Sequence, residues 1–373
     1  MRRDEKYVNI ILWIEIISFF LQFTFSFFYA YASAIEFCSF VPILFLMLKI
    51  KFRGKDDRWK LPIVLVAAIF CLMSMLFNSS SVGIGSIMTL FKFLAFSLLM
   101  TKFSIYKKTG KKLLAVFFLQ LVLLNVVDLS VYNTNTIGLN FLVIGIYIIL
   151  LLSSLYPDKF LLTLAIAAFI DFNIWLSGSR TCLMAFTLFY VGTFLSKYFF
   201  TNRTVLLVLS LLLTIGSLVY VQTYIYLWES NLVATELMQE SIEATGKSVF
   251  SGRQFIWKEA LELLNEKPLV GTGSKIHLQS FFMVNLHNSI LNFFVIYGYV
   301  VGSLIVYLIV RMIMGLHRFM YDEIVRSCVV AYFAFLLVAF SETNLLLLPF
   351  MCSFCLFMAY ARKKELSSSL VIN

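Results

Sequence analysis

The uncharged stretch TIGLNFLVIGIYIILLLS, residues 136–153, is typical of the twelve apolar segments that decide the fold of this chain. A helix that spans a bilayer needs about 20 mostly apolar residues. Within lipid every backbone amide needs an internal partner, so such a segment forms a helix rather than an isolated strand. The stretch therefore predicts a transmembrane helix.

Eleven further segments have the same character. With the first they lie near residues 7–29, 32–49, 61–77, 82–100, 113–132, 136–153, 159–176, 181–199, 204–223, 287–311, 324–340 and 344–361. The composition, 61% hydrophobic and 13% charged, excludes a water-soluble globular protein. We therefore expect an all-α polytopic membrane protein, a single domain of about twelve transmembrane helices over residues 1–373.

The net charge of +10 does not indicate nucleic-acid binding, because of where the charges lie. If the N-terminus is cytoplasmic, most Lys and Arg residues fall in cytoplasmic loops, including the run at 49–60. The exceptions are Lys92, which lies within a span, Arg180 and the basic residues of one long polar segment, 224–286. The bias predicts cytoplasmic termini and places that segment outside, between the ninth and tenth spans.

The long loop is expected to contain a helix after Ser251, which with Gln254 resembles a capping box. Apolar residues recur there at helical spacing, and Arg253 projects on the same side as this stripe. Because the stripe should rest on the membrane domain, Arg253 is expected to point inward. The alternative is a solvated arginine in a first helical turn, where the helix dipole does not favour a cation.

His287 is expected to open the tenth span, with Asn285 as its cap. A helix N-terminus suits a phosphate and favours neutral imidazole, which accepts protons. His287 is therefore either a general base or a phosphate contact, or else an interfacial histidine bonded to a backbone carbonyl. His277 and His317 are interpreted as structural.

A few other polar residues lie at or within the spans. Apart from those of the long polar segment, Arg180 is the one basic residue expected on the outer side. Its side chain either extends to the lipid headgroups or binds a phosphate. Placing the charged side chains of Lys92 and Asp171 in lipid costs free energy. Both should therefore face the bundle interior, paired with one another or lining a polar cavity. Glu342 and Asn344 form the short outer turn between the last two spans and border the same cavity.

Several motifs are absent from the sequence. It has no P-loop, dinucleotide fingerprint, HExxH or Cys/His metal cluster, and no Asp-x-Asp pair for a metal-bound nucleotide-sugar. We therefore expect neither metal nor cofactor. An enzyme acting outside the membrane then needs an already activated donor, such as a polyprenyl-pyrophosphate sugar.

The motifs over residues 175–310 resemble those of the O-antigen polymerase and O-antigen ligase superfamily. They are Gly178-Ser179-Arg180, Ser251-Gly252-Arg253 with Ile256-Trp257, Pro268-x-x-Gly271-x-Gly273, and His287-Asn288-x-x-Leu291 with Gly298. The resemblance implies a GT-C-like membrane glycosyltransferase of the bacterial cytoplasmic membrane, metal-independent and inverting. It also implies that Arg180 and Arg253 hold a donor pyrophosphate and that His287 serves at the reaction centre.

We therefore predict a polysaccharide polymerase that joins undecaprenyl-pyrophosphate-linked oligosaccharide units on the outer face of the membrane. Its catalytic residues are His287, Arg253 and Arg180, and its expected substrate-binding residues are Asn288, Lys92 and Glu342. Its expected partners, besides the lipid bilayer, are a chain-length regulator and a flippase of the same pathway. The alternatives are a ligase that moves finished glycan to lipid A core or another acceptor, and a glycolipid flippase or exporter without catalysis.

Overall fold

A computed structural model describes residues 3–29, 31–50, 65, 68–69, 84–104, 107–130, 132–245, 250, 252–273, 276, 278 and 286–370. All regular structure in these residues is helical. The helices are α1 (Arg3–Thr24), α2 (Ser26–Tyr29), α3 (Ala32–Leu48), α6 (Ile84–Leu99), η1 (Met100–Lys102), α7 (Lys107–Leu124), α8 (Thr134–Leu155), α9 (Phe160–Leu176), α10 (Arg180–Phe199), α11 (Arg203–Glu229), α12 (Asn231–Thr245), α13 (Arg253–Glu266), α14 (Ser289–Met314), η2 (His317–Phe319), α15 (Glu323–Val338), α16 (Asn344–Leu347) and α17 (Pro349–Leu370).

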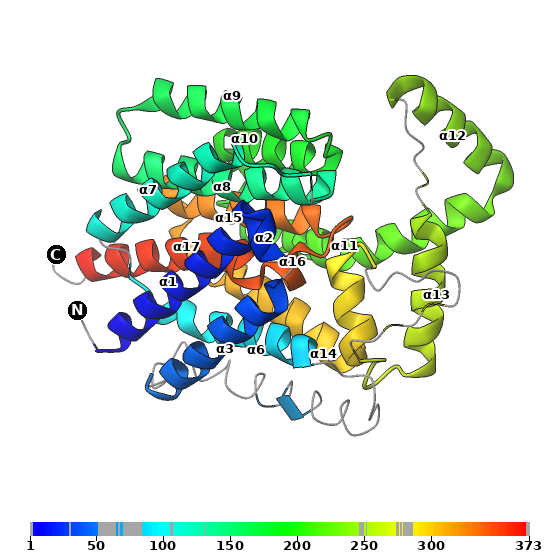
Figure 1. Ribbon diagram of the computed structural model, residues 1–373, viewed down its shortest axis with the longest axis horizontal. Coiled ribbons are helices and arrows are strands. Elements are labelled where there is room, and N and C mark those ends of the chain that lie inside the picture. The colour runs from blue at the N-terminus through cyan, green and yellow to red at the C-terminus, as the bar shows by residue number, and fades with distance from the viewer. Residues whose placement is uncertain are drawn as a thin grey trace.

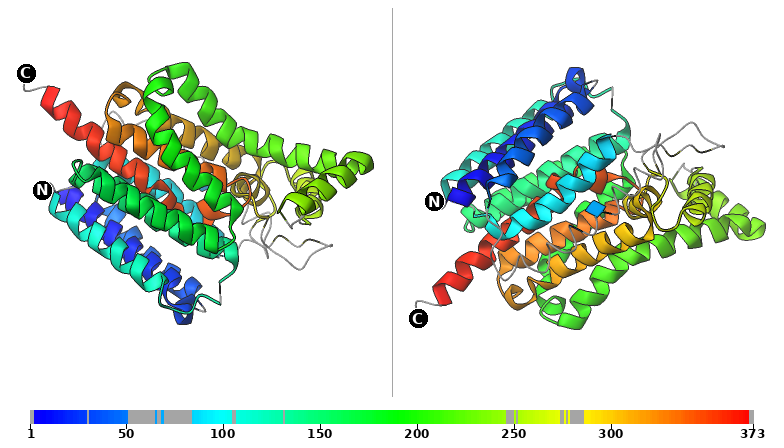
Figure 2. Two further views of the ribbon diagram at one scale, coloured as in Figure 1. Left: turned by 90° about the horizontal axis from the view of Figure 1, so that it is seen from above. Right: turned by 90° about the horizontal axis from the view of Figure 1, so that it is seen from below.

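The long helices run side by side in one bundle, and both chain termini lie at the same end of it (Figures 1 and 2). The helices α12 and α13 lie at the opposite end, beyond the long helices. There α13 and the first turns of α14 run next to each other across the bundle, rather than along it. This end, remote from the termini, is called the distal end below.

The side chains of the bundle divide as expected for helices in lipid. Buried apolar residues fill α8 and α15 at the centre, whereas α9, α10 and α11 expose large ones such as Trp175, Met184 and Val219. Exposed apolar surface of this extent marks a surface that contacts lipid or a partner. In the described residues five helices are long and apolar enough to cross a membrane, namely those within Asp4–Thr24, Thr134–Leu155, Arg180–Phe199, Arg203–Glu229 and Ser289–Phe319.

Helices thus occupy most of each predicted apolar stretch that the structure describes. The stretch 61–77 lies almost wholly outside the described residues. The protein is an all-helical, polytopic membrane protein, and the number of twelve crossings stays a prediction.

Three predicted boundaries were wrong. The helix α7 ends at Leu124, well before residue 132. The last predicted span is two helices, because Pro349 begins α17 after the short α16. Proline suits the first position of a helix, where its missing N–H leaves no bond unmade. The ninth span, lastly, extends past residue 223, since α11 continues to Glu229, and α12 and α13 follow within the long polar segment.

Candidate active site at the distal end

The carboxylate of Glu342 is the meeting point of three side chains from distant parts of the sequence. Nη2 of Arg253 lies 3.3 Å from its Oε1, and Nδ1 of His287 lies 3.5 Å from its Oε2. Asn135 also donates from Nδ2 to Oε1 at 2.6 Å. The side chains of Arg253, His287 and Glu342 keep 20%, 23% and 13% of their surface exposed, so the cluster is half-buried but reachable.

Glu342 is held in place by the turn between α15 and α16. Its backbone N–H donates to the carbonyl of Val338 at 2.9 Å, which closes the end of α15. Its own carbonyl accepts a hydrogen bond from the hydroxyl of Ser289 at 2.8 Å, so the start of α14 is tied to the same turn. Asn344, the first residue of α16, is fully buried and accepts from that same hydroxyl at 3.1 Å. The backbone that carries the carboxylate of Glu342 is therefore fixed relative to α14, α15 and α16.

Arg253 begins α13, directly after Gly252. Gly252 adopts φ 85°, a left-handed conformation that glycine reaches without strain, and as the N-cap residue it has no side chain with which to cap the helix. The predicted capping box was therefore wrong in its cap position, and Ser251 itself lies outside the described residues. As expected, Arg253 points inward, and the carboxylate of Glu342 offsets the unfavourable helix dipole.

The indole of Trp257 fixes α13 to the rest of the site. Trp257 is fully buried and its ring lies 4.9 Å from that of Tyr224 and 5.7 Å from that of Tyr220, both on α11. Its Nε1 donates to the carbonyl of Leu286 at 2.6 Å. Since Leu286 precedes His287, this bond links the helix that carries Arg253 to the backbone that carries the histidine.

His287 lies before α14 and not in its first turn. Its φ of 49° is left-handed, which helical residues do not adopt. The N-cap is Asn288, whose Oδ1 accepts from the N–H of Leu291 at 2.8 Å. The expected cap, Asn285, lies outside the described residues, as does His277. A left-handed non-glycine residue costs about 1–3 kcal/mol and persists only where its surroundings hold it.

Asn288 supplies much of that hold. It is fully buried, and its amide donates to Ser217 Oγ at 2.9 Å and to the carbonyl of Phe340 at 3.0 Å. These bonds join α14 to α11 and to the end of α15. The geometry gives Asn288 the task of positioning its neighbour His287, whereas a direct substrate contact by Asn288 stays a prediction.

The glycine motif after α13 is hydrogen-bonded to the backbone at a break in α14. Gly298 has φ 78° and interrupts the helix. The irregular segment 271–273 bonds to the carbonyls that the break releases, with Thr272 N–H donating to Val295 at 2.8 Å and Gly273 N–H to Ile296 at 3.0 Å. On the far side of the break, Tyr299 N–H donates to the carbonyl of Pro268 at 2.7 Å. Irregular backbone at membrane depth is tolerated where protein buries it in this way.

This backbone crossing leaves no room for side chains. A Cβ on Gly271 would lie 2.4 Å from the carbonyl oxygen of Ile296, and one on Gly298 would lie 2.3 Å from that of Leu269. Both glycines are therefore required by contact as well as by φ. The motif thus fastens the end of α13 to the middle of α14.

Arg180 lies at the same end of the bundle, as the first residue of α10, and its side chain is exposed. The next residue, Thr181, accepts a hydrogen bond at Oγ1 from Ser341 at 2.9 Å. Ser341 directly precedes Glu342. The start of α10 is therefore attached to the turn that carries the central carboxylate.

Lys92 does not pair with Asp171, so that expectation was wrong. As predicted Lys92 faces the interior, with 1% of its side chain exposed, but its ion pairs are with Glu15 at 2.9 Å and with Glu36. These residues lie on α6, α1 and α3, whereas Asp171 lies on α9. Sequence reveals that a lysine within a span needs a carboxylate but not which helix supplies it. The described contacts of Lys92 do not reach Glu342.

Asn135 is a member of the cluster that sequence reasoning missed. It follows the α8 N-cap Asn133 in a polar run, which reads as ordinary capping. Only the fold shows that its amide meets a carboxylate 207 residues later.

The helices and this cluster define a multi-pass membrane protein with a half-buried Arg–Glu–His site at one end of its bundle. Residues 160–307 match the family model described as O-antigen ligase, so this part of the chain is similar to the O-antigen ligase-like superfamily. Members are membrane glycosyltransferase-like enzymes, ligases or polymerases, that act on polyprenyl-linked glycans. The family and the apolar helices indicate a multi-pass protein of the bacterial inner membrane.

The matched region is less than half of the chain. It contains Arg180, Arg253 and His287, whereas Glu342 and Asn135 lie outside it. Searches of the curated proteins and of the solved structures found no match.

Proposed function

We propose that this protein is a polysaccharide polymerase. It joins glycan units carried on undecaprenyl pyrophosphate at the outer face of the membrane, with inversion at the anomeric carbon and without a metal. The observation that carries the proposal is the single carboxylate of Glu342 in contact with both Arg253 and His287. A general base and an anion-binding cation are thereby held next to each other.

The imidazole of His287 is the proton acceptor in this mechanism. A hydroxyl of one lipid-linked unit attacks the anomeric carbon of the glycan on a second carrier. The new C–O bond forms as the bond to the pyrophosphate oxygen breaks, and the hydroxyl proton passes to His287. Glu342, at 3.5 Å from Nδ1, orients the ring and stabilises the imidazolium that results. Glu342, expected to bind substrate, is here a positioning residue.

The two arginines receive the leaving group. Arg253 and Arg180 are each the first residue of a helix, α13 and α10 respectively. A helix N-terminus offers backbone N–H groups and a positive dipole end to a phosphate. Glu342 engages one nitrogen of Arg253, and a guanidinium carries five N–H donors in all. Preorganised cations of this kind stabilise the negative charge that grows on the departing pyrophosphate.

A ligase reaction is the second candidate, favoured by the description of the matched family. It uses the same donor, base and arginines and differs only in the acceptor, which is lipid A core or another molecule. A flippase without chemistry is disfavoured by the His287–Glu342 pair, since translocation needs no general base.

The test uses the purified full-length protein with a lipid-linked donor. His287→Ala should lower the single-turnover rate by about 10²–10⁴-fold while donor binding largely persists. Glu342→Gln, which keeps the shape but loses the charge, should also lower the rate, up to the about 10⁴-fold loss seen when a triad carboxylate becomes an amide. His317→Ala, on the exposed turn at the other end of the bundle, is the control and should leave both quantities unchanged.

Wild-type rates in both variants would refute the base assignment. If donor binding falls together with the rate in His287→Ala, the histidine contacts phosphate instead. Identification of the product then separates the candidates, because a polymerase lengthens lipid-linked glycan and a ligase transfers it off the lipid carrier.

A further inference from the structure

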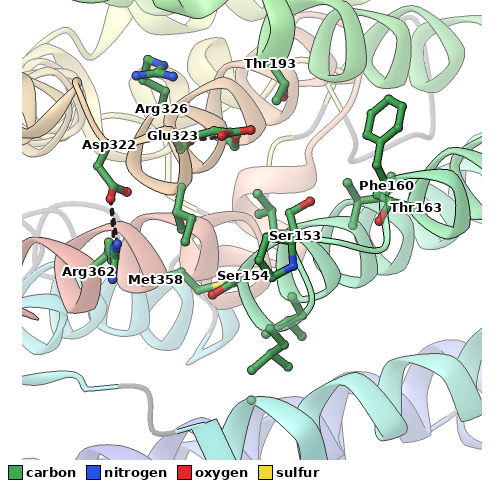
Figure 3. Close-up of a pocket in the computed structure, with 18 of the residues that line it drawn as sticks. Ser153, Ser154, Phe160, Thr163, Thr193, Asp322, Glu323, Arg326, Met358 and Arg362 are labelled. Carbon is green, nitrogen blue, oxygen red and sulfur yellow. Dashed lines mark hydrogen bonds and ion pairs between the residues drawn. The ribbon is translucent and has the colours of Figure 1, made fainter.

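A cavity lies at the end of the bundle that carries both termini, and Figure 3 shows ten labelled residues that line it. Its volume is about 820 Å³. The ends of α8, α10 and α17 and the starts of α7, α9 and α15 enclose it. It belongs to no part of the proposed active site, whose residues are all at the distal end.

The walls of this cavity have two characters. One part is apolar and aromatic, with Ile149, Leu150, Leu151, Leu155, Phe160, Phe189, Phe194 and Met358. The other part is polar and carries the charged residues Lys107, Lys197, Asp322, Glu323, Arg326, Arg362 and Glu365. A groove between membrane helices that is apolar along one part and charged at the other matches the acyl chain and the charged headgroup of a lipid molecule.

The charges in the polar part do not cancel. Arg362 is bound to Asp322 at 3.0 Å and to Glu365 at 3.1 Å, so these three groups largely satisfy one another. Among the other lining residues this leaves three cations, Lys107, Lys197 and Arg326, and one carboxylate, Glu323. Arg326 gives one nitrogen to the carbonyls of Met320 and Tyr321, whereas its Nε is buried without a hydrogen-bond partner. The polar part of the cavity therefore carries an excess of positive charge, and one of its N–H donors is buried.

We propose that this cavity binds an anionic phospholipid, with its phosphate at Lys107, Lys197 and Arg326 and an acyl chain along the apolar wall. A zwitterionic lipid would bring a cation to an already positive site. A water-soluble phosphate would leave the aromatic wall exposed to water. Basic pockets between transmembrane helices are suited to acidic headgroups for this reason.

The test measures retention of defined lipids by native mass spectrometry of the full-length protein in detergent. The probes are phosphatidylglycerol, phosphatidylcholine and glycerophosphoglycerol, which is the acidic headgroup without chains. Wild type should retain phosphatidylglycerol in preference to both others. A basic residue near a membrane surface contributes about 1 kcal/mol to lipid binding, which is about fivefold in affinity. The double variant K107Q/K197Q should therefore weaken retention by more than about tenfold.

The matched control is K102Q/K108Q. Lys108 is the exposed neighbour of Lys107 on α7 and, like Lys102, does not line the cavity, so retention should stay at the wild-type level. A second variant, Ser153→Phe, fills the cavity without any change of charge and should also reduce retention. Equal loss in both double variants, no loss in K107Q/K197Q, or equal binding of phosphatidylcholine would each overturn the proposal. Equal retention of glycerophosphoglycerol would overturn it in favour of a free phosphate.

Discussion

The indole N–H of Trp257 is bonded to the backbone carbonyl of Leu286 at 2.6 Å, across 29 residues of the chain. Through this one bond the position of His287 depends on the packing of α13 against α11. Trp257 touches no reacting group in the proposed mechanism, so its contribution is to geometry. A contribution to geometry can be distinguished by measurement from direct contact with a reacting group.

Trp257→Phe keeps an aromatic ring in the buried site and removes only the N–H. The carbonyl of Leu286 then lacks its partner, which costs about 1–3 kcal/mol for a buried group. We expect a lower melting temperature and a slower single turnover, with donor binding near that of wild type. Tyr224→Phe on the facing helix α11 is the control, since its ring contact with Trp257 remains. A wild-type turnover rate in Trp257→Phe would show that this bond does not position the histidine.

The two arginines are expected to be intolerant of lysine. Arg180→Lys and Arg253→Lys each keep the positive charge but lose the planar fork that grips a phosphate by two bonds. Each variant should bind donor more weakly and make less polymer than wild type, at normal protein levels. Lys258→Ala on the exposed side of α13 is the matched control for Arg253, because its partner Glu229 lies at the surface. Full polymer synthesis by either Arg→Ala variant would remove that arginine from the mechanism.

Gly298→Ala tests the backbone crossing. The new Cβ would lie 2.3 Å from the carbonyl oxygen of Leu269, at a φ that alanine rarely adopts, so we expect a loss of thermal stability and of activity together. Gly216→Ala is the matched control, since Gly216 lies in α11 with no atom within 4 Å of the added Cβ. Alanine favours a helix over glycine by about 1 kcal/mol, so this control should be neutral or slightly stabilising. Equal melting temperatures for the two variants would argue against the crossing.

Membrane orientation is tested by cysteine labelling. The charge bias predicts that α12 faces outward and that the turn between α8 and α9 faces the cytoplasm. In a cysteine-free background, Glu240→Cys should react with an impermeant thiol reagent in intact cells. Asp158→Cys, in the turn at the opposite end of the bundle, should react only after the membrane is opened. The reverse pattern, with Asp158→Cys labelled in intact cells and Glu240→Cys only after the membrane is opened, would place the proposed site in the wrong compartment for its substrate.

The helical class and the residues around Arg253 could be predicted because they follow from local patterns. Apolar length identifies helices in lipid, and the spacing of Ile256 and Ala260 places Arg253 on the inner side of α13. Local patterns failed at the helix ends, where left-handed backbone at Gly252 and His287 displaced the expected caps. Such conformations depend on bonds from elsewhere in the fold, like that of Trp257.

The composition of the site was predicted only in part for a related reason. Glu342 was recognised as a polar residue in an outer turn, but its contact with His287 joins segments that no periodicity relates. Asn135 gave no signal beyond ordinary helix capping. Pairing of Lys92 with Asp171, one of the two expected arrangements, was wrong because a charged residue within a span reveals its need for a counter-ion and not the packing order of the helices.

The break at Gly298 also has a mechanical consequence. The helix α13 is fixed near its first turn by the Trp257–Leu286 bond, which reaches the backbone just before His287, and at its far end by the segment 271–273, which reaches the middle of α14. Arg253 and His287 are therefore fixed relative to each other. Because Ser289 bonds the start of α14 to the backbone carbonyl of Glu342, this frame and the shared carboxylate have one common support, so the site is assembled before any substrate binds.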